Sequence, residues 1–280
     1  MSDALLETIA GKPVLRFERR LAHPPAKVWR AITRPEELKH WFPAVLETEP
    51  RAGAPITFTF MEEDPPEVTE GEVVEVDEPK VFAYTWGEDM LRWELVPDGE
   101  GTLLVFTQTI SESTGGVLAA GRNAAGWDEC LRLFVARLDG ATVEPTPREE
   151  VMAGIQSYID KFGVGEPEVT EREVRVRRDL VWAPAEQVWQ VLTGDGAAPG
   201  EPAPQFAIVD QLGAATVTTA ERPTVLECDT ATDGRIRWEI TESTAGYVVT
   251  VTHTGAAADV ADAWRRRVDE LFAAVHGLKR

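Results

Sequence analysis

The histidines and cysteines are the first residues to consider for chemistry, and their spacing argues against metal binding and nucleophilic catalysis. The two cysteines, Cys130 and Cys228, lie far apart and form no CxxC motif. No Ser-His-Asp or Cys-His arrangement can be assembled from the sequence. We therefore expect no catalytic residue, no metal and no cofactor. The four histidines also lack the HxxxH or HExxH spacing that places two ligands on one helix face: His23, His40, His253 and His276.

Two further motifs resemble ligand sites only in part. Residues 116–123, GVLAAGRN, have the glycine spacing of a P-loop, but Arg122 and Asn123 stand where lysine and serine or threonine should be. We interpret these glycines as a mobile approach to the next helix and as a gate over a pocket mouth. Residues 62–78 contain nine acidic residues and no basic one, without the ligand spacing of a calcium loop. That segment is interpreted as a solvated hairpin.

Aromatic residues are the better candidates for a binding site, because the chain has nine tryptophans, more than is usual at this length. Aromatic walls bind apolar rings through contact area and stacking. Trp93 and Trp127 have counterparts in the second half of the chain, which favours a role in the core. The residues that we expect to line a cavity are Trp41, Phe42, Phe58, Phe60, Trp86, Trp93, Gln108, Trp127 and Phe134.

Strand alternation bears on the polar residues near these aromatic side chains. If Trp93 faces the interior, its neighbour Arg92 faces outward, because successive strand residues point to opposite faces. Arg92 would then pair with Glu94 on the surface. Gln108 could orient a ligand if it faces inward, but the pattern leaves its direction open.

The chain contains an internal repeat, which sets its domain organisation. The offset between matching blocks falls from 160 to 145 to 137, so the second copy is shorter. Because the matching blocks occur in the same order in both halves, we expect two homologous domains in tandem. Three blocks recur: residues 21–33 in 181–193, 91–109 in 236–254, and 127–140 in 264–277.

We divide the chain into a first domain at 1–145, a helical linker at 146–167 and a second, abbreviated domain at 168–280. In the second copy, a segment rich in Pro, Gly and Ala at 194–205 replaces a short amphipathic segment, so the two domains should differ in function. The linker should be a helix of about four turns whose apolar face docks on one or both domains. A flexible linker is the alternative. The apolar positions of that helix are Val151, Ile155, Tyr158 and Phe162.

Each copy begins with an alternating strand and a helix that starts at proline, continues as an antiparallel meander and ends in a long helix. In the first copy, the last helix carries apolar residues at i, i+4, i+7 and i+11. This order is typical of an α+β fold in which a curved sheet wraps the C-terminal helix and leaves a cavity between them. The stripe consists of Trp127, Leu131, Phe134 and Leu138.

Three segments of the first copy, FERRLAHPPAKVWRAITRPEELKHWFPA, GEVVEVDEPKVFAYTW and AAGWDECLRLFVARLDG, occur in an order that resembles a known family. This is the heat-shock-protein-90 ATPase activator homologue family of the START-like superfamily (SRPBCC, birch-pollen-allergen-like). The resemblance covers essentially all of the first copy, whereas the second copy lacks the HWF segment. It implies tandem helix-grip domains, an internal pocket for apolar molecules and an association with the stress response.

Charge and composition limit the partners. With 48 acidic and 28 basic residues, the net charge of −20 repels polyanions, so we expect no nucleic-acid partner. The first twelve residues lack the basic start of a secretory signal, and no apolar run approaches the ~18–20 residues of a membrane span. We expect a cytoplasmic protein without membrane anchoring.

The leading functional hypothesis is non-catalytic binding of a small hydrophobic or aromatic molecule in the first domain, whose cavity should be the larger of the two. The second domain would be structural or mediate interactions with a protein partner. Two alternatives remain open: a polyketide-cyclase-like or hydrolase-like enzyme, and a chaperone-associated protein-interaction module.

Overall fold

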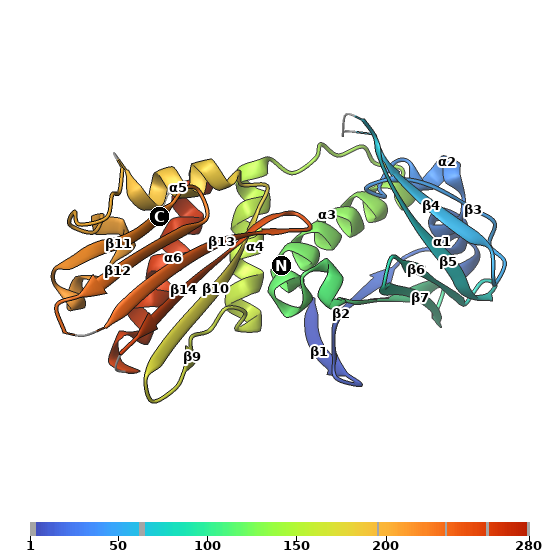
Figure 1. The fold of residues 1–280 in the computed structure, drawn as a ribbon. Helices are drawn as coiled ribbons and strands as arrows, with labels where there is room; N and C mark the ends of the chain where they lie inside the picture. Colours follow the sequence, from blue (N-terminus) through green and yellow to red (C-terminus); the bar gives the residue numbers. More distant parts are fainter. Residues whose placement is uncertain (1–3, 62–64, 195, 233, 256–257, 279–280) are drawn as a thin grey trace. The chain divides into compact units, whose positions relative to one another are not determined.

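The chain divides into two units, Met1–Tyr158 and Ile159–Arg280, which we call the first and second unit (Figure 1). The computed structural model describes residues 4–61, 65–194, 196–232, 234–255 and 258–278. Each unit combines one antiparallel sheet with a long helix against it. The protein is therefore an α+β protein with two tandem helix-grip domains, and the predicted fold class is confirmed.

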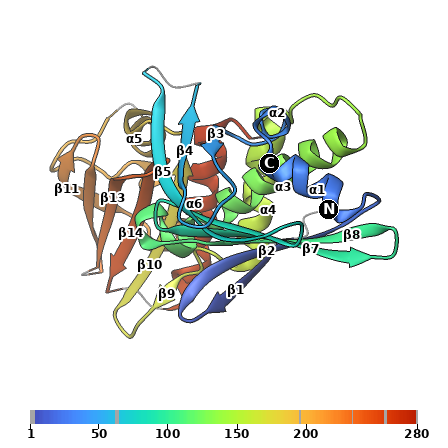
Figure 2. The ribbon, with the colours of Figure 1, turned by 90° about the vertical axis from the view of Figure 1, so that its right-hand side faces the viewer.

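The sheet of the first unit has eight strands in the order β1-β2-β8-β7-β6-β5-β4-β3. In Figure 2, β4 and β5 run steeply across the direction of β2, β7 and β8, so the sheet bends strongly. The register between β5 and β6 shifts between Val73 and Glu75, and such bulges increase local twist. The strands are β1 (Leu5–Ile9), β2 (Lys12–Leu21), β3 (Val45–Thr48), β4 (Pro55–Phe60), β5 (Glu67–Asp77), β6 (Val81–Trp86), β7 (Asp89–Asp98) and β8 (Gly101–Thr109).

The helices of the first unit are α1 (Pro25–Thr33), α2 (Pro35–Leu38), the 3-10 turns η1 (Glu112–Thr114) and η2 (Gly116–Ala119), and α3 (Ala120–Leu138). The predicted apolar stripe of α3, from Trp127 to Leu138, is buried. The helix begins earlier than the sequence indicates, because the P-loop-like segment contributes η2 and the first turn of α3 rather than a loop. Asn123 is consequently a helical residue.

One hairpin of the first unit was not predicted. Strands β1 and β2 join through Ala10 and Gly11, which have φ angles of 50° and 79°. Alanine rarely adopts a left-handed conformation, so Gly11 is the one residue of the turn that the sequence could have signalled.

The acidic hairpin expected at 62–78 corresponds to the β4–β5 connection and β5; residues 62–64 of that prediction lie outside the described residues.

The second unit has a six-stranded sheet in the order β11-β12-β13-β14-β10-β9. Its long helix α6 (Ala261–His276) buries Trp264, Val268, Leu271 and Val275, as the repeat predicts. The segment that replaces the amphipathic stretch makes a bridge from Pro202 to Thr216. The remaining elements are β9 (Glu168–Val169), β10 (Glu173–Val181), α5 (Ala185–Thr193), η3 (Gln205–Ala207), η4 (Asp210–Leu212), β11 (Ala215–Glu221), β12 (Val225–Thr230), β13 (Arg235–Ser243), β14 (Gly246–Thr254) and η5 (Ala258–Val260).

The linker segment contains the expected helix, α4 (Arg148–Phe162), which begins in the first unit and ends in the second. Ile155 and Tyr158 are buried as predicted, but Met152 and Ile159 are buried where Val151 and Phe162 are only half-buried. The buried face is thus offset from the predicted one. Within the first unit, the Tyr158 hydroxyl donates a hydrogen bond to Asp128 of α3 over 2.7 Å, so the first part of α4 docks on α3.

Candidate functional site

All nine residues predicted to line a cavity lie between the sheet and α3 of the first unit. Seven of them are at most 7% exposed, while Phe60 and Trp86 are half-buried. We call their eight rings the aromatic cluster. The elements contribute as follows: Trp41 and Phe42 follow α2, Phe58 and Phe60 lie on β4, Trp86 on β6, Trp93 on β7, Gln108 on β8, and Trp127 and Phe134 on α3.

The inner part of the aromatic cluster packs like a core. The Trp41 indole N–H donates to the carbonyl of Ala31 over 3.0 Å, and its ring centroid lies 4.9 Å from that of Phe134 and 5.6 Å from that of Trp93. Trp93 points inward and Arg92 points outward to Glu94, with a Nε–Oε1 distance of 2.7 Å, as alternation predicts. These edge-to-face contacts fix the rings in place.

The outer part of the cluster is a stack of nearly parallel rings that reaches the surface. Phe58 and Trp86 stack with centroids 4.5 Å apart and planes 11° apart. Phe42 lies against Phe58 at 6.1 Å, and Phe60 lies against Trp86 at 5.6 Å, both within 25° of parallel. We call Phe42, Phe58, Phe60 and Trp86 the outer stack. Phe42 and Phe58 are buried, whereas Phe60 and Trp86 are only half-buried, so the outer stack is the accessible end of the cluster.

Gln108 faces the interior, which settles the direction that the sequence left open. Its Oε1 accepts a hydrogen bond from Trp127 Nε1 at 2.7 Å, and its Nε2 donates to Asp89 Oδ2 at 3.0 Å. Asp89 is 4% exposed and also accepts from the Ser111 backbone N–H at 2.7 Å and the Thr114 hydroxyl at 3.0 Å. Both ends of the Gln108 amide are therefore used to hold Trp127 and the segment that leads into α3.

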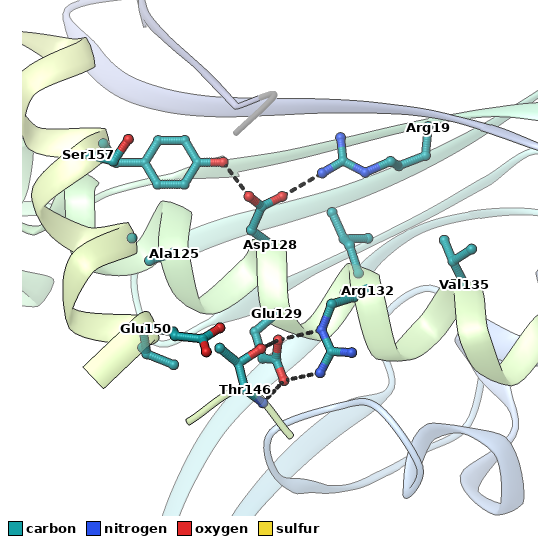
Figure 3. A pocket seen from close by; sticks show the side chains of 13 residues that line it. Arg19, Ala125, Asp128, Glu129, Arg132, Val135, Thr146, Glu150 and Ser157 are labelled. Carbon is teal, nitrogen blue, oxygen red and sulfur yellow. Dashed lines mark hydrogen bonds and ion pairs between the residues drawn. The ribbon is translucent and has the colours of Figure 1, made fainter. Parts of the chain in front are cut away.

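The larger described pocket lies on the other side of α3, between α3 and α4, and has a volume of about 920 Å³ (Figure 3). Arg19 and Asp128 form an ion pair across it at 2.6 Å. Asp128 also accepts the hydrogen bond from Tyr158, and burial, together with this carboxylate, raises the pKa of Tyr158. The charged groups at this end of the pocket are engaged with one another.

A second set of contacts lines the same pocket. Arg132 binds both carboxylate oxygens of Glu129 at 2.8 Å, and these hydrogen bonds, with those from Thr146, lower the pKa of Glu129 to about 2. Arg132 also donates to the Glu144 carbonyl at 2.7 Å. These groups connect α4 and its preceding segment to α3. We therefore interpret the pocket as part of the packing contact between these elements and not as a ligand site. This pocket could not be predicted from the sequence, because it depends on how two helices cross.

The smaller described pocket, about 350 Å³, lies where α1 meets the end of α3. Lys27 Nζ donates to the Leu138 carbonyl at 2.7 Å, and His23 pairs with Asp139 at 2.7 Å. A cation at a helix C-terminus stabilises the helix dipole, so this cluster caps α3. None of the nine predicted residues lines either of these two pockets; their rings contact one another in the space where the sequence predicts a cavity.

No cluster of three or more His, Cys, Asp or Glu side chains suited to a metal occurs within the described ranges. Burial raises the pKa of Cys130 to about 12 and that of Cys228 to about 11, so both thiols stay protonated at neutral pH. Among the described helices, none combines the length and apolar character needed to cross a membrane.

The interior of the second unit repeats part of this arrangement. Trp238 and Trp264 occupy the positions of Trp93 and Trp127, with ring centroids 5.8 Å apart. His253 takes the place of Gln108, and its Nδ1 accepts from Trp264 Nε1 at 3.2 Å. Burial lowers the pKa of His253, which keeps the imidazole neutral for this hydrogen bond. The ring contacts described around Trp264 include no equivalent of the outer stack.

Comparison with known proteins gives one family and several structures. Residues 22–139 match the model of the family described as "Activator of Hsp90 ATPase homolog 1-like protein". A conserved protein of unknown function from Enterococcus faecalis is 20% identical, with 57% of this chain and 90% of that chain covered and a TM-score of 0.48. CalU16 from Micromonospora echinospora is 19% identical, with 57% and 95% covered and a TM-score of 0.45. No curated protein matches the chain.

Proposed function

We propose that the first unit, whose residues 22–139 match the Activator of Hsp90 ATPase homolog 1-like family, binds a small, flat, hydrophobic or aromatic molecule without catalysing a reaction. The ligand contacts the outer stack. The second unit serves a structural or interaction role.

The observation that carries this proposal is the outer stack itself. Its rings are nearly parallel, and the series ends in the half-buried Trp86 and Phe60. A flat ligand gains contact area and stacking by entering the stack beside Trp86, and each aromatic pair contributes about 0.5–1.5 kcal/mol beyond burial. The Trp86 indole is held in orientation by the hydrogen bond from its Nε1 to Thr69 Oγ1 at 2.7 Å. Entry into the stack requires Phe42 or Phe60 to move aside, since these rings occupy the space.

Titration calorimetry of the full chain against lipids, flavonoids, polyketides and flat tricyclic compounds tests the proposal. Saturable binding is expected for flat aromatic members of the panel. Replacing Trp86 with alanine should weaken it at least about tenfold, the effect of losing roughly 1.4 kcal/mol. The matched control is Trp182→Ala, which removes a tryptophan that is 55% exposed in the second unit and should leave the affinity unchanged. Absence of binding across the panel would refute the proposal.

A second candidate, association with the host Hsp90, is favoured by the family match alone. If it is correct, the full chain should be retained by immobilised Hsp90 and should change its ATPase rate. Retention that is unaffected by Trp86→Ala would separate this activity from ligand binding.

We also infer that the units are duplicated domains, at 1–145 and 168–280, joined by a linker at 146–167, and that the protein is cytoplasmic. Limited proteolysis should release stable fragments cut at these boundaries, and a first cut inside either sheet would contradict them. Cell fractionation tests the location.

A further inference from the structure

One buried polar atom in the first unit is left without a partner. In the part of the chain that the structure describes, Asn123 Nδ2 is buried and makes no hydrogen bond. The residue lies in the first turn of α3, four positions before Trp127. Residues four apart on a helix share a face, so the amide borders the face that carries Trp127 toward the aromatic cluster.

The contacts of α3 indicate which end of the cluster Asn123 approaches. Phe134 packs on Trp41, and Trp127, two turns earlier on the helix, packs on Phe42 with centroids 5.9 Å apart. Phe42 in turn lies 5.9 Å from Trp86. Residues nearer the N-terminus of α3 therefore lie nearer the outer stack. Asn123 lies one further turn, about 5.4 Å, in this direction.

A neighbouring contact supports the same side of the helix. Trp127 packs on Trp93 with ring centroids 5.9 Å apart, and the Trp93 indole N–H donates to the Tyr84 hydroxyl at 3.3 Å. Cys130, on α3 between Trp127 and Phe134, adds to the rise that burial causes in the pKa of Tyr84. Tyr84 and Trp86 are two residues apart on β6 and therefore point to the same face of the sheet. The side of α3 that carries Asn123 and Cys130 thus faces the strand that carries Trp86.

The second unit lacks this donor. At the offset of 137 that relates the two long helices, the residue matching Asn123 is Val260, which is buried at the end of η5. Helix α3 has 19 residues and α6 has 16, and Asn123 lies in the additional first turn. The unpaired amide therefore occurs in the unit that also has the outer stack.

A buried amide N–H without a partner is unfavourable, because it has lost its hydrogen bond to water. An occupant of the outer stack that presents an oxygen would restore that bond. Resting on the proposed function, we propose that Asn123 Nδ2 donates a hydrogen bond to the ligand, which is a flat aromatic compound bearing a carbonyl-type acceptor oxygen.

The test compares two probes of the same shape, 9-fluorenone and fluorene, which differ in the carbonyl group. Calorimetry on the full chain should give about tenfold tighter binding of 9-fluorenone, the effect of one hydrogen bond to a buried donor. Asn123→Leu, of similar size, should bring the ratio of the two affinities close to one without weakening fluorene. Asn123→Ala should do the same, and circular dichroism establishes that each variant is folded.

Ser243→Ala is the matched control, because Ser243 Oγ is also buried without a hydrogen-bond partner among the described residues but lies on β13 of the second unit. This variant should keep the tenfold ratio. Equal binding of both probes to the unmodified chain, or a ratio that persists in both Asn123 variants, would overturn the role of Asn123 and leave the proposed function standing. Failure of both probes to bind would instead count against the proposed function.

Discussion

The interiors of the two units share one pair of tryptophans, Trp93 and Trp127 in the first and Trp238 and Trp264 in the second, but differ in the polar residues around them. In the first unit, Trp127 donates to Gln108, and Gln108 donates to Asp89. In the second unit, Trp264 donates to His253, and the position of Asp89 is Gly234. The same indole N–H is thus satisfied in two ways, by an amide backed by a carboxylate and by a neutral imidazole.

Gly234 explains why these two substitutions go together. A Cβ at this position would lie 2.8 Å from Thr230 Oγ1 and 3.0 Å from His253 Nε2. A side chain such as that of Asp89 therefore has no room beside the imidazole. The first unit thus uses Gln108 and Asp89 to hold the segment that enters its long helix, whereas the second unit has His253 and Gly234 at the corresponding positions. That entry segment is where the first unit carries Asn123.

The largest effect is expected from breaking the polar chain of the first unit. Asp89→Ala leaves Gln108 Nε2 and the Ser111 N–H without their acceptor and removes one acceptor of the Thr114 hydroxyl, and it should lower the free energy of unfolding by about 3–5 kcal/mol. Urea unfolding followed by circular dichroism measures this loss. Asp98→Ala, at an exposed ion pair with Arg20, is the control and should change stability by less than about 1 kcal/mol. Equal losses of stability in the two variants would show that the hydrogen bonds of Asp89 do not stabilise the first unit.

A smaller, pH-dependent effect is expected in the second unit. Because burial lowers the pKa of His253 below its ordinary value of 6.5, the unfolded chain takes up a proton below this pH that the folded chain does not. Stability is therefore full above about pH 6.5 and falls as the pH is lowered toward the folded pKa, by at most about 1.4 kcal/mol per pH unit. His253→Gln, which copies the first unit, should remove this slope. Unfolding curves from pH 5 to 8 test it, and an unchanged slope would contradict the assignment.

The smallest effect is expected where the two units are alike. Arg92 pairs with Glu75 and Glu94 on the outer face of the first sheet, and Arg237 pairs with Glu227 and Glu239 on the second. Because these pairs are partly exposed, Arg92→Met and Arg237→Met should each cost less than about 1 kcal/mol in unfolding free energy. A difference above 1 kcal/mol between them would mean that the sheets are less equivalent than their sequences indicate.

The side of a strand or helix on which a residue lies could be predicted from the repeat of residue types along the sequence. Contacts that depend on tertiary packing could not. Alternation correctly placed Trp93 inside and Arg92 outside, because neighbouring strand residues must face opposite ways. Gln108 could not be placed, because an amide suits either side and its burial depends on Asp89. Asn123 was missed because the glycines before it suggested a loop, although the helix begins at Ala120. The docking of Tyr158 on Asp128 could not be foreseen, since it depends on how α4 crosses α3.

If the first unit and not the second holds the ligand, the tryptophans of the two units should respond differently to it. Each of the nine tryptophans gives one indole N–H signal in a ¹⁵N NMR spectrum, which single Trp→Phe variants can assign. On titration with 9-fluorenone, the signal of Trp86 should shift most, followed by that of Trp127, while those of Trp238 and Trp264 stay in place. Shifts at Trp238 and Trp264 with Trp86 unmoved would contradict the account.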